Sequence, residues 1–251
     1  MSDRVILKLG GSVITDKGSD CTVNRSALDG IARAIAGAHS AHLLIVHGAG
    51  SCGHPEAHRY HLDKGAAAGQ TEGIYVTHRA VSALNEAVVS SLREAGVPAL
   101  GVHPLHVGVA DNGRLVAFES RHLEKMLALG LVPVIHGDVV MDLSRGACIV
   151  SGDQLVRYLA VALKCTRVGL ATDVPGVLNG GRVVSEITPE TVQSLQIGNS
   201  SHTDVTGGMK GKIDELLGLA TAGIGADIFQ VSRLGDFLAG NDHGGTKVRG
   251  A

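Results

Sequence analysis

Short apolar runs alternate with stretches of helical periodicity along most of the chain. Six continuous apolar runs predict buried strands: Val5–Leu9, His42–His47, Pro98–Val102, Val132–His136, Arg167–Ala171 and Asp227–Val231. Five stretches between them have the apolar spacing of amphipathic helices: Arg25–Ala38, Ile74–Ala95, Ser120–Leu129, Asp153–Lys164 and Met209–Thr221. Strands that are apolar on both faces and alternate with helices predict an α/β fold, a mainly parallel sheet covered by helices on both faces.

The chain is expected to form one domain, residues 1–251, with a weak boundary near residue 165. The segment Asn179–His202 is polar and is predicted to be irregular. Open parallel sheets bind ligands at the carboxyl ends of their strands, so candidate chemistry is sought in the loops that follow the strands.

Glycine is abundant, at 35 of 251 residues, and it gathers at those strand ends. Four clusters follow a strand or open a helix: residues 10–12, 48–53, 151–153 and 204–212. Glycine lets backbone N–H groups approach an anion, and a helix N-terminus adds a favourable dipole. A single Gly-Gly pair is more often only a tight turn, but four clusters with lysines beside them indicate binding of a polyphosphate and a second anion.

Composition excludes several other classes of protein. With 22 basic and 24 acidic residues, the net charge of −2 gives no basic surface for nucleic acid, and three Tyr, three Phe and no Trp offer little for stacking on bases. No signal-peptide core or membrane-spanning run is present in the sequence, which favours a cytoplasmic protein with no membrane partner. The four cysteines, Cys21, Cys52, Cys148 and Cys165, show no C-x-x-C pair and are expected to be reduced thiols.

Two motifs have competing interpretations. Gly48-x-Gly50-x-x-Gly53 matches a dinucleotide fingerprint, but Pro55 follows at once where a helix is required, and Glu72 does not end a second strand; a Rossmann oxidoreductase remains an alternative. His54, His58 and His61 would share one face of a helix and resemble a metal site, yet 13 histidines make chance spacing common, so no metal site is predicted.

The motifs together resemble the amino acid kinase superfamily and, within it, the isopentenyl phosphate kinase branch. The resemblance spans nearly the whole chain. The residues that carry it are Val5–Lys17, Val46–Ser51 with Gly53–Pro55, Ile135–Val139, Ser151–Gln154, Thr172–Val174 with Gly176-Val177, Asp204–Met209 with Lys212, and Gly245-Thr246. It implies a three-layer αβα sandwich that transfers a phosphoryl group from ATP, with Mg²⁺, to isopentenyl phosphate in isoprenoid biosynthesis. It also implies a homodimer, with residues 1–165 as acceptor lobe and 166–251 as nucleotide lobe.

The same resemblance implies roles for individual residues. The catalytic group would be Lys8, Lys17, Asp153 and Lys212, with Asp153 holding the lysines and not acting as a base. The ATP-binding group would be Lys8, Gly10, Gly11, Ser12, Thr172, Asp173, Gly176, Gly207, Gly208, Lys210 and Lys212. The acceptor-binding group would be Gly48, Ala49, Gly50, Gly53, His54 and Gly152.

Structural alternatives stay open at several of these positions. Lys8 is a charge within a buried strand and needs a partner for that reason alone, and Asp153 has the residue type of a helix N-cap. Two positions depart from the family pattern: Cys52 replaces an aromatic residue, and Pro175 replaces an aspartate. The alternative functions are a related kinase of another small acceptor, such as fosfomycin, and a non-catalytic anion sensor on the same fold.

Overall fold

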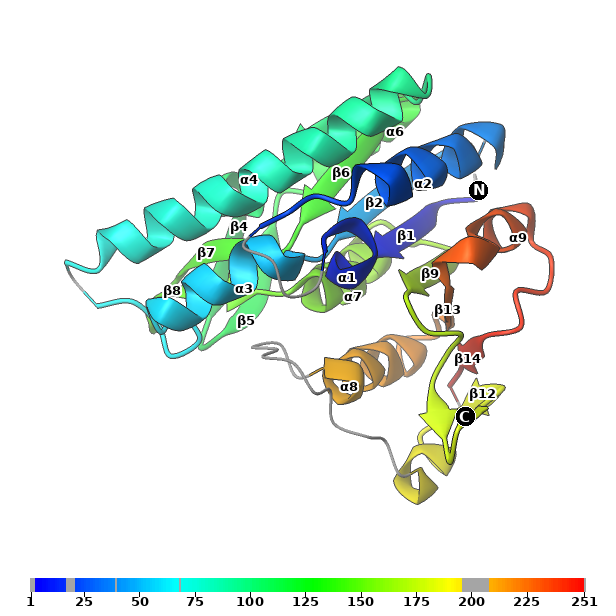
Figure 1. Ribbon diagram of the computed structural model, residues 1–251. Helices are drawn as coiled ribbons and strands as arrows, with labels where there is room; N and C mark the ends of the chain where they lie inside the picture. The colour runs from blue at the N-terminus through cyan, green and yellow to red at the C-terminus, as the bar shows by residue number, and fades with distance from the viewer. Residues whose placement is uncertain (1–2, 17–20, 39, 68, 196–207, 251) are drawn as a thin grey trace.

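An eight-stranded sheet forms the centre of the protein (Figure 1). The structure is a computed structural model that describes residues 3–16, 21–38, 40–67, 69–195 and 208–250. In spatial order the strands are β12 (Glu186–Ile187), β14 (Thr246–Val248), β13 (Ala226–Gln230), β9 (Arg167–Thr172), β1 (Val5–Leu9), β2 (Leu43–His47), β6 (Val132–His136) and β3 (Ala99–Val102).

Strand β1 lies in the middle of this sheet and is parallel to both neighbours. Lys8 on β1 is in register with Val46 on β2 and with Leu170 on β9. The pairs β2–β6, β3–β6 and β9–β13 are also parallel, and β14 runs antiparallel to β13. The expected mainly parallel sheet is therefore confirmed, and the carboxyl ends of its parallel strands share one edge.

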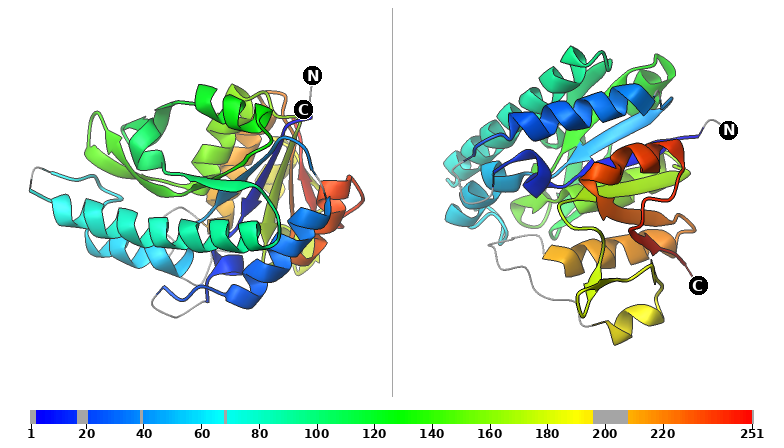
Figure 2. Two further views of the ribbon diagram at one scale, coloured as in Figure 1. Left: turned by 90° about the horizontal axis from the view of Figure 1, so that it is seen from above. Right: turned by 45° about the vertical axis from the view of Figure 1, so that its right-hand side comes forward.

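Helices cover both faces of the sheet, as the three-layer prediction requires (Figure 2). One core lies under α2 (Arg25–Ala38), α4 (Thr71–Glu94) and α9 (Leu234–Ala239). The other lies under α6 (Arg121–Ala128), α7 (Gly152–Ala162) and α8 (Gly208–Ala220). Alternate strand residues serve the two cores, so Leu7 packs toward the first and Ile6 toward the second.

A second sheet and several of the helices were not predicted. The sheet has the order β5 (Arg114–Phe118), β4 (Gly108–Asp111), β7 (Asp138–Asp142) and β8 (Gly146–Val150). Helix α3 (Gly50–Arg59) begins inside the second glycine cluster and contains Pro55, so the expectation that Pro55 prevents a helix there is wrong. The helix packs closely against α4, because a Cβ at Gly53 would lie 2.6 Å from Val81 Cγ1.

The remaining elements are short. They are α1 (Gly11–Ile14), α5 (Pro104–Val107), β10 (Leu178–Asn179), β11 (Arg182–Val183), and the 3₁₀ turns Thr191–Ser194 and Val231–Arg233. The segment predicted to be irregular thus contains β11 and β12, and β12 extends the main sheet beside β14. Among the described helices, none combines the length and apolar character needed to cross a membrane.

Candidate active site

A buried ion pair joins the central strand to α7 at the carboxyl edge of the sheet. Lys8 Nζ on β1 donates to Asp153 Oδ1 at 2.5 Å, and the two residues are 4 % and 5 % exposed. Lys212 Nζ on α8 lies 3.9 Å from Asp153 Oδ2, and its side chain is 19 % exposed. One carboxylate therefore holds two cations that come from distant parts of the chain, which concentrates positive charge at the strand end.

Asp153 is available for the lysines because another residue caps α7. Ser151 is the N-cap, and its Oγ accepts the N–H of Gln154 at 3.2 Å. The alternative in which Asp153 caps its own helix is therefore wrong. At Gly152, a Cβ would lie 3.1 Å from Lys8 Cε, so the missing side chain leaves room for Lys8 to reach Asp153.

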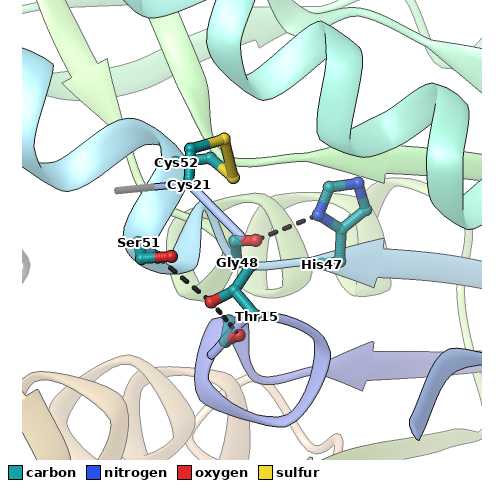
Figure 3. The surroundings of a disulfide bond; sticks show 7 residues. Thr15, Cys21, His47, Gly48, Ser51 and Cys52 are labelled. Atoms are coloured by element: carbon teal, nitrogen blue, oxygen red, sulfur yellow. Dashed lines mark hydrogen bonds between the residues drawn. A yellow bond between two sulfur atoms is a disulfide. The ribbon is translucent and has the colours of Figure 1, made fainter. Parts of the chain in front are cut away.

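The loops that follow β1 and β2 touch each other through glycine backbone, and Figure 3 shows Thr15 of the first loop beside Gly48 and Ser51 of the second. A Cβ at Gly11 would lie 2.3 Å from Gly50 N, and Gly50 itself has φ +55°. Thr15 ties the loops together, because its Oγ1 donates to Gly11 O at 2.9 Å and accepts Ser51 N–H at 3.1 Å. Glycine at these positions therefore allows the backbones of the two candidate phosphate loops to touch. This role is separate from letting backbone N–H groups approach an anion.

The acceptor residues expected from the sequence gather around the start of α3. Ala49 is its N-cap residue, and Gly50 and Gly53 lie in its first turns. His54 lies in the next turn, half-buried. The first N–H groups of a helix have no partner within the helix. Ser51 N–H donates to Thr15 Oγ1 and Cys52 N–H to Ala49 O, so we expect the N–H groups of Ala49 and Gly50 to be the donors for an anion. Gly53 also has the packing role against Val81 described above.

The residues expected to bind nucleotide fall into two groups. Gly10 and Ser12 lie at the end of β1, where Gly10 N–H donates to Ala171 O at 2.9 Å and Ser12 is exposed. Thr172 ends β9, and its Oγ1 donates to Val174 O and Phe229 O, so its hydroxyl shapes the loop.

Further along, Asp173 is exposed, whereas Gly176 is buried against Thr246. Gly208 opens α8, and Lys210 is exposed in its first turn. Lys17 and Gly207 lie outside the described residues.

A clamp of two arginines holds the helix that carries Lys212. Glu215, one turn after Lys212, pairs with Arg114 of β5 and with Arg157 of α7, the latter at 3.2 Å. The paired carboxylate raises the pKa of the Arg114 guanidinium. The clamp joins α8 to α7 and to the second sheet, and so supports the position of Lys212 near Asp153.

The expectation of four reduced cysteines is wrong for one pair. Cys21 and Cys52 form a disulfide that links the segment after Thr15 to α3 (Figure 3). Sequence spacing could not reveal it, because 31 positions separate the two residues and the fold alone brings them together. Cys148 and Cys165 are free thiols, as expected. Both are also buried, and burial raises the pKa of each thiol to about 12.

The histidine trio of the sequence does not form one helical face. His54 and His58 lie on α3, but His61 follows the end of that helix with φ +54°. Within the described ranges, no group of three His, Cys, Asp or Glu side chains is arranged to hold a metal ion.

A different set of histidines is buried beside the candidate acceptor loop. His47 and His136 end β2 and β6, and both are fully buried. Burial lowers the pKa of His47 to about 4 and that of His136 well below its usual range. Sequence reasoning missed this pair, although its signal is present: each histidine ends an apolar run and precedes a glycine.

The histidine pair continues into a network that reaches α4. His103 lies near His136, and burial lowers its pKa. On α4, His78 Nδ1 lies 3.0 Å from Asp138 Oδ2, and this hydrogen bond raises the pKa of His78. Asp138 is 1 % exposed, and burial raises the pKa of its carboxyl group.

Comparison with known proteins gives one consistent family. The model of the amino acid kinase family matches residues 3–230. Isopentenyl phosphate kinase of Haloferax volcanii is 43% identical over 248 residues, which are 98% of this chain and 98% of the relative. The enzyme of the same name from Methanothermobacter thermautotrophicus is 37% identical and covers 98% of this chain and 99% of its own. An isopentenyl phosphate kinase solved by X-ray crystallography superposes with a TM-score of 0.86 at 34% identity, over 97% of this chain and 99% of that one.

Proposed function

Because the chain belongs to the amino acid kinase family, a family of phosphotransferases, we propose that it transfers the γ-phosphoryl group of ATP to isopentenyl phosphate. The product would be isopentenyl diphosphate, a step of isoprenoid biosynthesis in an alternate mevalonate pathway. The observation that carries the proposal is the Lys8–Asp153–Lys212 arrangement at the carboxyl end of the central strand. The relatives that match over almost the whole chain support the choice of acceptor.

Direct in-line transfer between the two phosphates suits these residues. Phosphoryl transfer is accelerated mainly by positioning and by neutralising charge on the transferring group. Lys8 and Lys212 provide two cations, and Asp153 fixes them without itself contacting a substrate proton. The acceptor phosphate is already an anionic nucleophile, so the mechanism needs no general base.

The acceptor phosphate would bind at Gly48, Ala49, Gly50 and Gly152, with His54 as a side-chain donor and with Gly53 packing α3 in place. The ATP phosphates would bind along Gly10, Gly11 and Ser12, with Lys17 nearby. Thr172, Asp173, Gly176 and the residues from Gly207 to Lys210 would complete the nucleotide side. In this assignment residues 1–165 bind the acceptor and residues 166–251 the nucleotide.

The donor set near the site fits a nucleotide that brings its own Mg²⁺. Among the described residues the site offers lysines and glycine backbone, and it has no cluster of carboxylates that would hold the ion alone. Mg²⁺ would supply further neutralisation of the phosphate oxygens. The residues of this chain would bind the phosphates and orient them.

An acceptor panel tests the proposal. ATP consumption is measured with isopentenyl phosphate, dimethylallyl phosphate, fosfomycin, UMP and N-acetylglutamate at equal concentrations, with Lys8→Met protein as the blank. We expect the highest kcat/KM with isopentenyl phosphate. A higher kcat/KM with any other member assigns a different acceptor, and no turnover with all five contradicts the proposed reaction.

The homodimer and the cytoplasmic location implied by the resemblance are part of the same proposal. Light scattering on the purified protein tests the dimer, for which a mass near twice the 25.8 kDa of one chain is expected.

A further inference from the structure

His47 and His136 form a matched pair at the ends of two adjacent strands. The two residues are in register across β2 and β6, and their rings stack with centroids 5.6 Å apart and planes 24° apart. His47 Nδ1 lies 3.0 Å from Gly48 O, and His136 Nδ1 lies 3.1 Å from Gly137 O. Each ring therefore holds the carbonyl group of the glycine that follows it.

The partners of each ring fix which nitrogen carries the proton. A carbonyl oxygen can only accept, so Nδ1 is the protonated nitrogen of both rings. Each Nε2 then accepts a hydrogen bond: His47 from Asn85 Nδ2 at 3.1 Å, and His136 from His103 Nδ1 at 2.9 Å. The second hydrogen of Asn85 Nδ2 goes to Val134 O at 3.2 Å. Both rings are thus neutral and fully bonded, in agreement with their lowered pKa values.

The backbone of His47 is the point where the candidate loops meet. His47 O accepts Gly137 N–H at 3.0 Å, and a Cβ at Gly152 would lie 3.3 Å from the same oxygen. Gly48 N–H donates to Leu9 O at 3.0 Å. The loops after β1, β2 and β6 and the start of α7 are therefore in contact at His47 and Gly48.

We propose that His47 is a positioning residue for the acceptor phosphate. In a trans peptide the N–H points away from the C=O, so the hydrogen bond that holds Gly48 O toward the imidazole directs Ala49 N–H to the opposite side. This inference rests on the proposed function, in which Ala49 and Gly50 bind the acceptor phosphate. His47 touches no substrate atom. It acts through the orientation of one peptide plane.

Two substitutions separate this role from simple packing. His47→Asn keeps a donor at the place of Nδ1 and loses the acceptor at Nε2, whereas His47→Gln keeps an acceptor near Nε2 and loses the donor. Each variant loses one hydrogen bond of the buried ring, so the pair separates loss of the donor from loss of the acceptor. His136→Gln is a third variant, which removes the equivalent donor outside the acceptor loop.

The experiment measures kcat and the KM values of both substrates in the purified full-length variants, together with Tm. We expect His47→Gln to raise the KM for isopentenyl phosphate about fivefold to tenfold, the effect of one hydrogen bond, with the KM for ATP unchanged. His47→Asn should keep the KM for isopentenyl phosphate within about twofold of the wild-type value, and the Tm values show whether both variants are folded. Equal acceptor KM values in the two His47 variants, or an equal rise in the KM for ATP, would overturn the positioning role.

A measurement on the unaltered protein covers the case in which His47→Gln does not fold. In ¹⁵N-histidine-labelled wild-type protein, the Nδ1–H signal that disappears in His47→Asn should shift as isopentenyl phosphate is added. An unchanged signal at saturating acceptor would overturn the positioning role alone. A wild-type protein that does not phosphorylate isopentenyl phosphate contradicts the proposed function itself, and the positioning role is rejected with it.

Discussion

At the scale of single residues, Lys8 shows how a charge is kept inside the core. The side chain lies in a strand whose other residues are all apolar and buried, and the carboxylate of Asp153 compensates the charge at that position. Breaking one side of a buried ion pair leaves the other charge uncompensated, which typically costs about 3–5 kcal/mol of stability. A variant at this position must therefore be assessed for folding and for turnover separately.

Lys8→Met is expected to lower kcat at least ~100-fold, the usual size of losing one group that stabilises the transferring charge. The unfolding free energy should fall by about 3 kcal/mol in the same variant. Initial rates of ATP consumption and urea unfolding measure the two effects. Lys125→Met, on the exposed face of α6, is the control and should change neither. Turnover close to that of the wild type in Lys8→Met would remove Lys8 from the catalytic group.

His54→Ala is expected to raise the KM for the acceptor and to leave the KM for ATP unchanged. Loss of a charge-assisted donor of about 1.5–3 kcal/mol corresponds to a rise in the acceptor KM of about 10- to 150-fold. His58→Ala, an exposed change on the same helix, serves as the matched control in the same steady-state assay. If the acceptor KM of His54→Ala equals that of the control, His54 has no part in binding the acceptor.

Local motifs predicted the residue types of the candidate site, and only the fold shows why they belong together. Lys8 and Asp153 are 145 positions apart, and no spacing rule links them. The Ser151 hydroxyl decides between capping and ion pairing for Asp153, a choice that the sequence leaves open because Ser and Asp are both good N-caps. His47 was not predicted as a site residue because it ends an apolar run and was assigned to the strand.

At the scale of elements, the sequence predicts a helix or strand well when its own apolar pattern is long. It fails when the element forms mainly through contacts with distant parts of the chain. Helix α2 has the predicted bounds, Arg25–Ala38, because its apolar positions repeat over four turns. Helix α3 has glycines and a proline that disfavour a helix locally, and it forms against α4 through the close approach at Gly53. The four strands of the second sheet are as short as those of the main sheet, but each contains exposed or partly exposed positions and lacks the continuous buried run of β1 or β6.

The disulfide between Cys21 and Cys52 is expected to stabilise the segment that joins α1 to α3. Its chain-entropy effect for a 31-residue separation is roughly 3–4 kcal/mol. Reduction, or Cys21→Ser, should therefore lower Tm, as followed by circular dichroism with and without dithiothreitol. Cys148→Ser, at a free cysteine, should keep the full response to dithiothreitol. A count of four free thiols in unreduced, denatured protein would contradict the disulfide.

At the scale of the whole molecule, buried histidines couple stability to pH. An unfolded histidine takes up a proton near pH 6.5, whereas folded His47 does so only at about pH 4. Between those values the unfolded chain binds more protons, so stability falls as the pH falls. The lowered pKa values of His136 and His103 also make stability fall as the pH falls. The raised pKa values of His78 and Asp138 have the opposite effect on stability.

The unfolding free energy is therefore expected to be lower at pH 5 than at pH 7.5, because the large downward shifts of His47 and His136 outweigh the opposing pair. His47 alone would contribute about 3 kcal/mol over its whole titration range. Urea unfolding at the two pH values measures the difference, and His47→Asn should make it smaller. Equal stability at both pH values would contradict the expectation that the shifts of His47 and His136 outweigh the opposing pair.

The position of β1 between β2 and β9 also determines how the chain can be divided. A cut in the turn between α7 and β9, near residue 165, leaves the first piece with the open edge of β1 and the second with the open edge of β9, each a row of unpaired backbone groups. Neither half is then expected to stay in solution alone, yet the two edges are complementary. Co-expressed halves should associate by pairing β1 with β9. Because Lys8 and Lys212 would then lie on different polypeptides, kinase activity would measure that association.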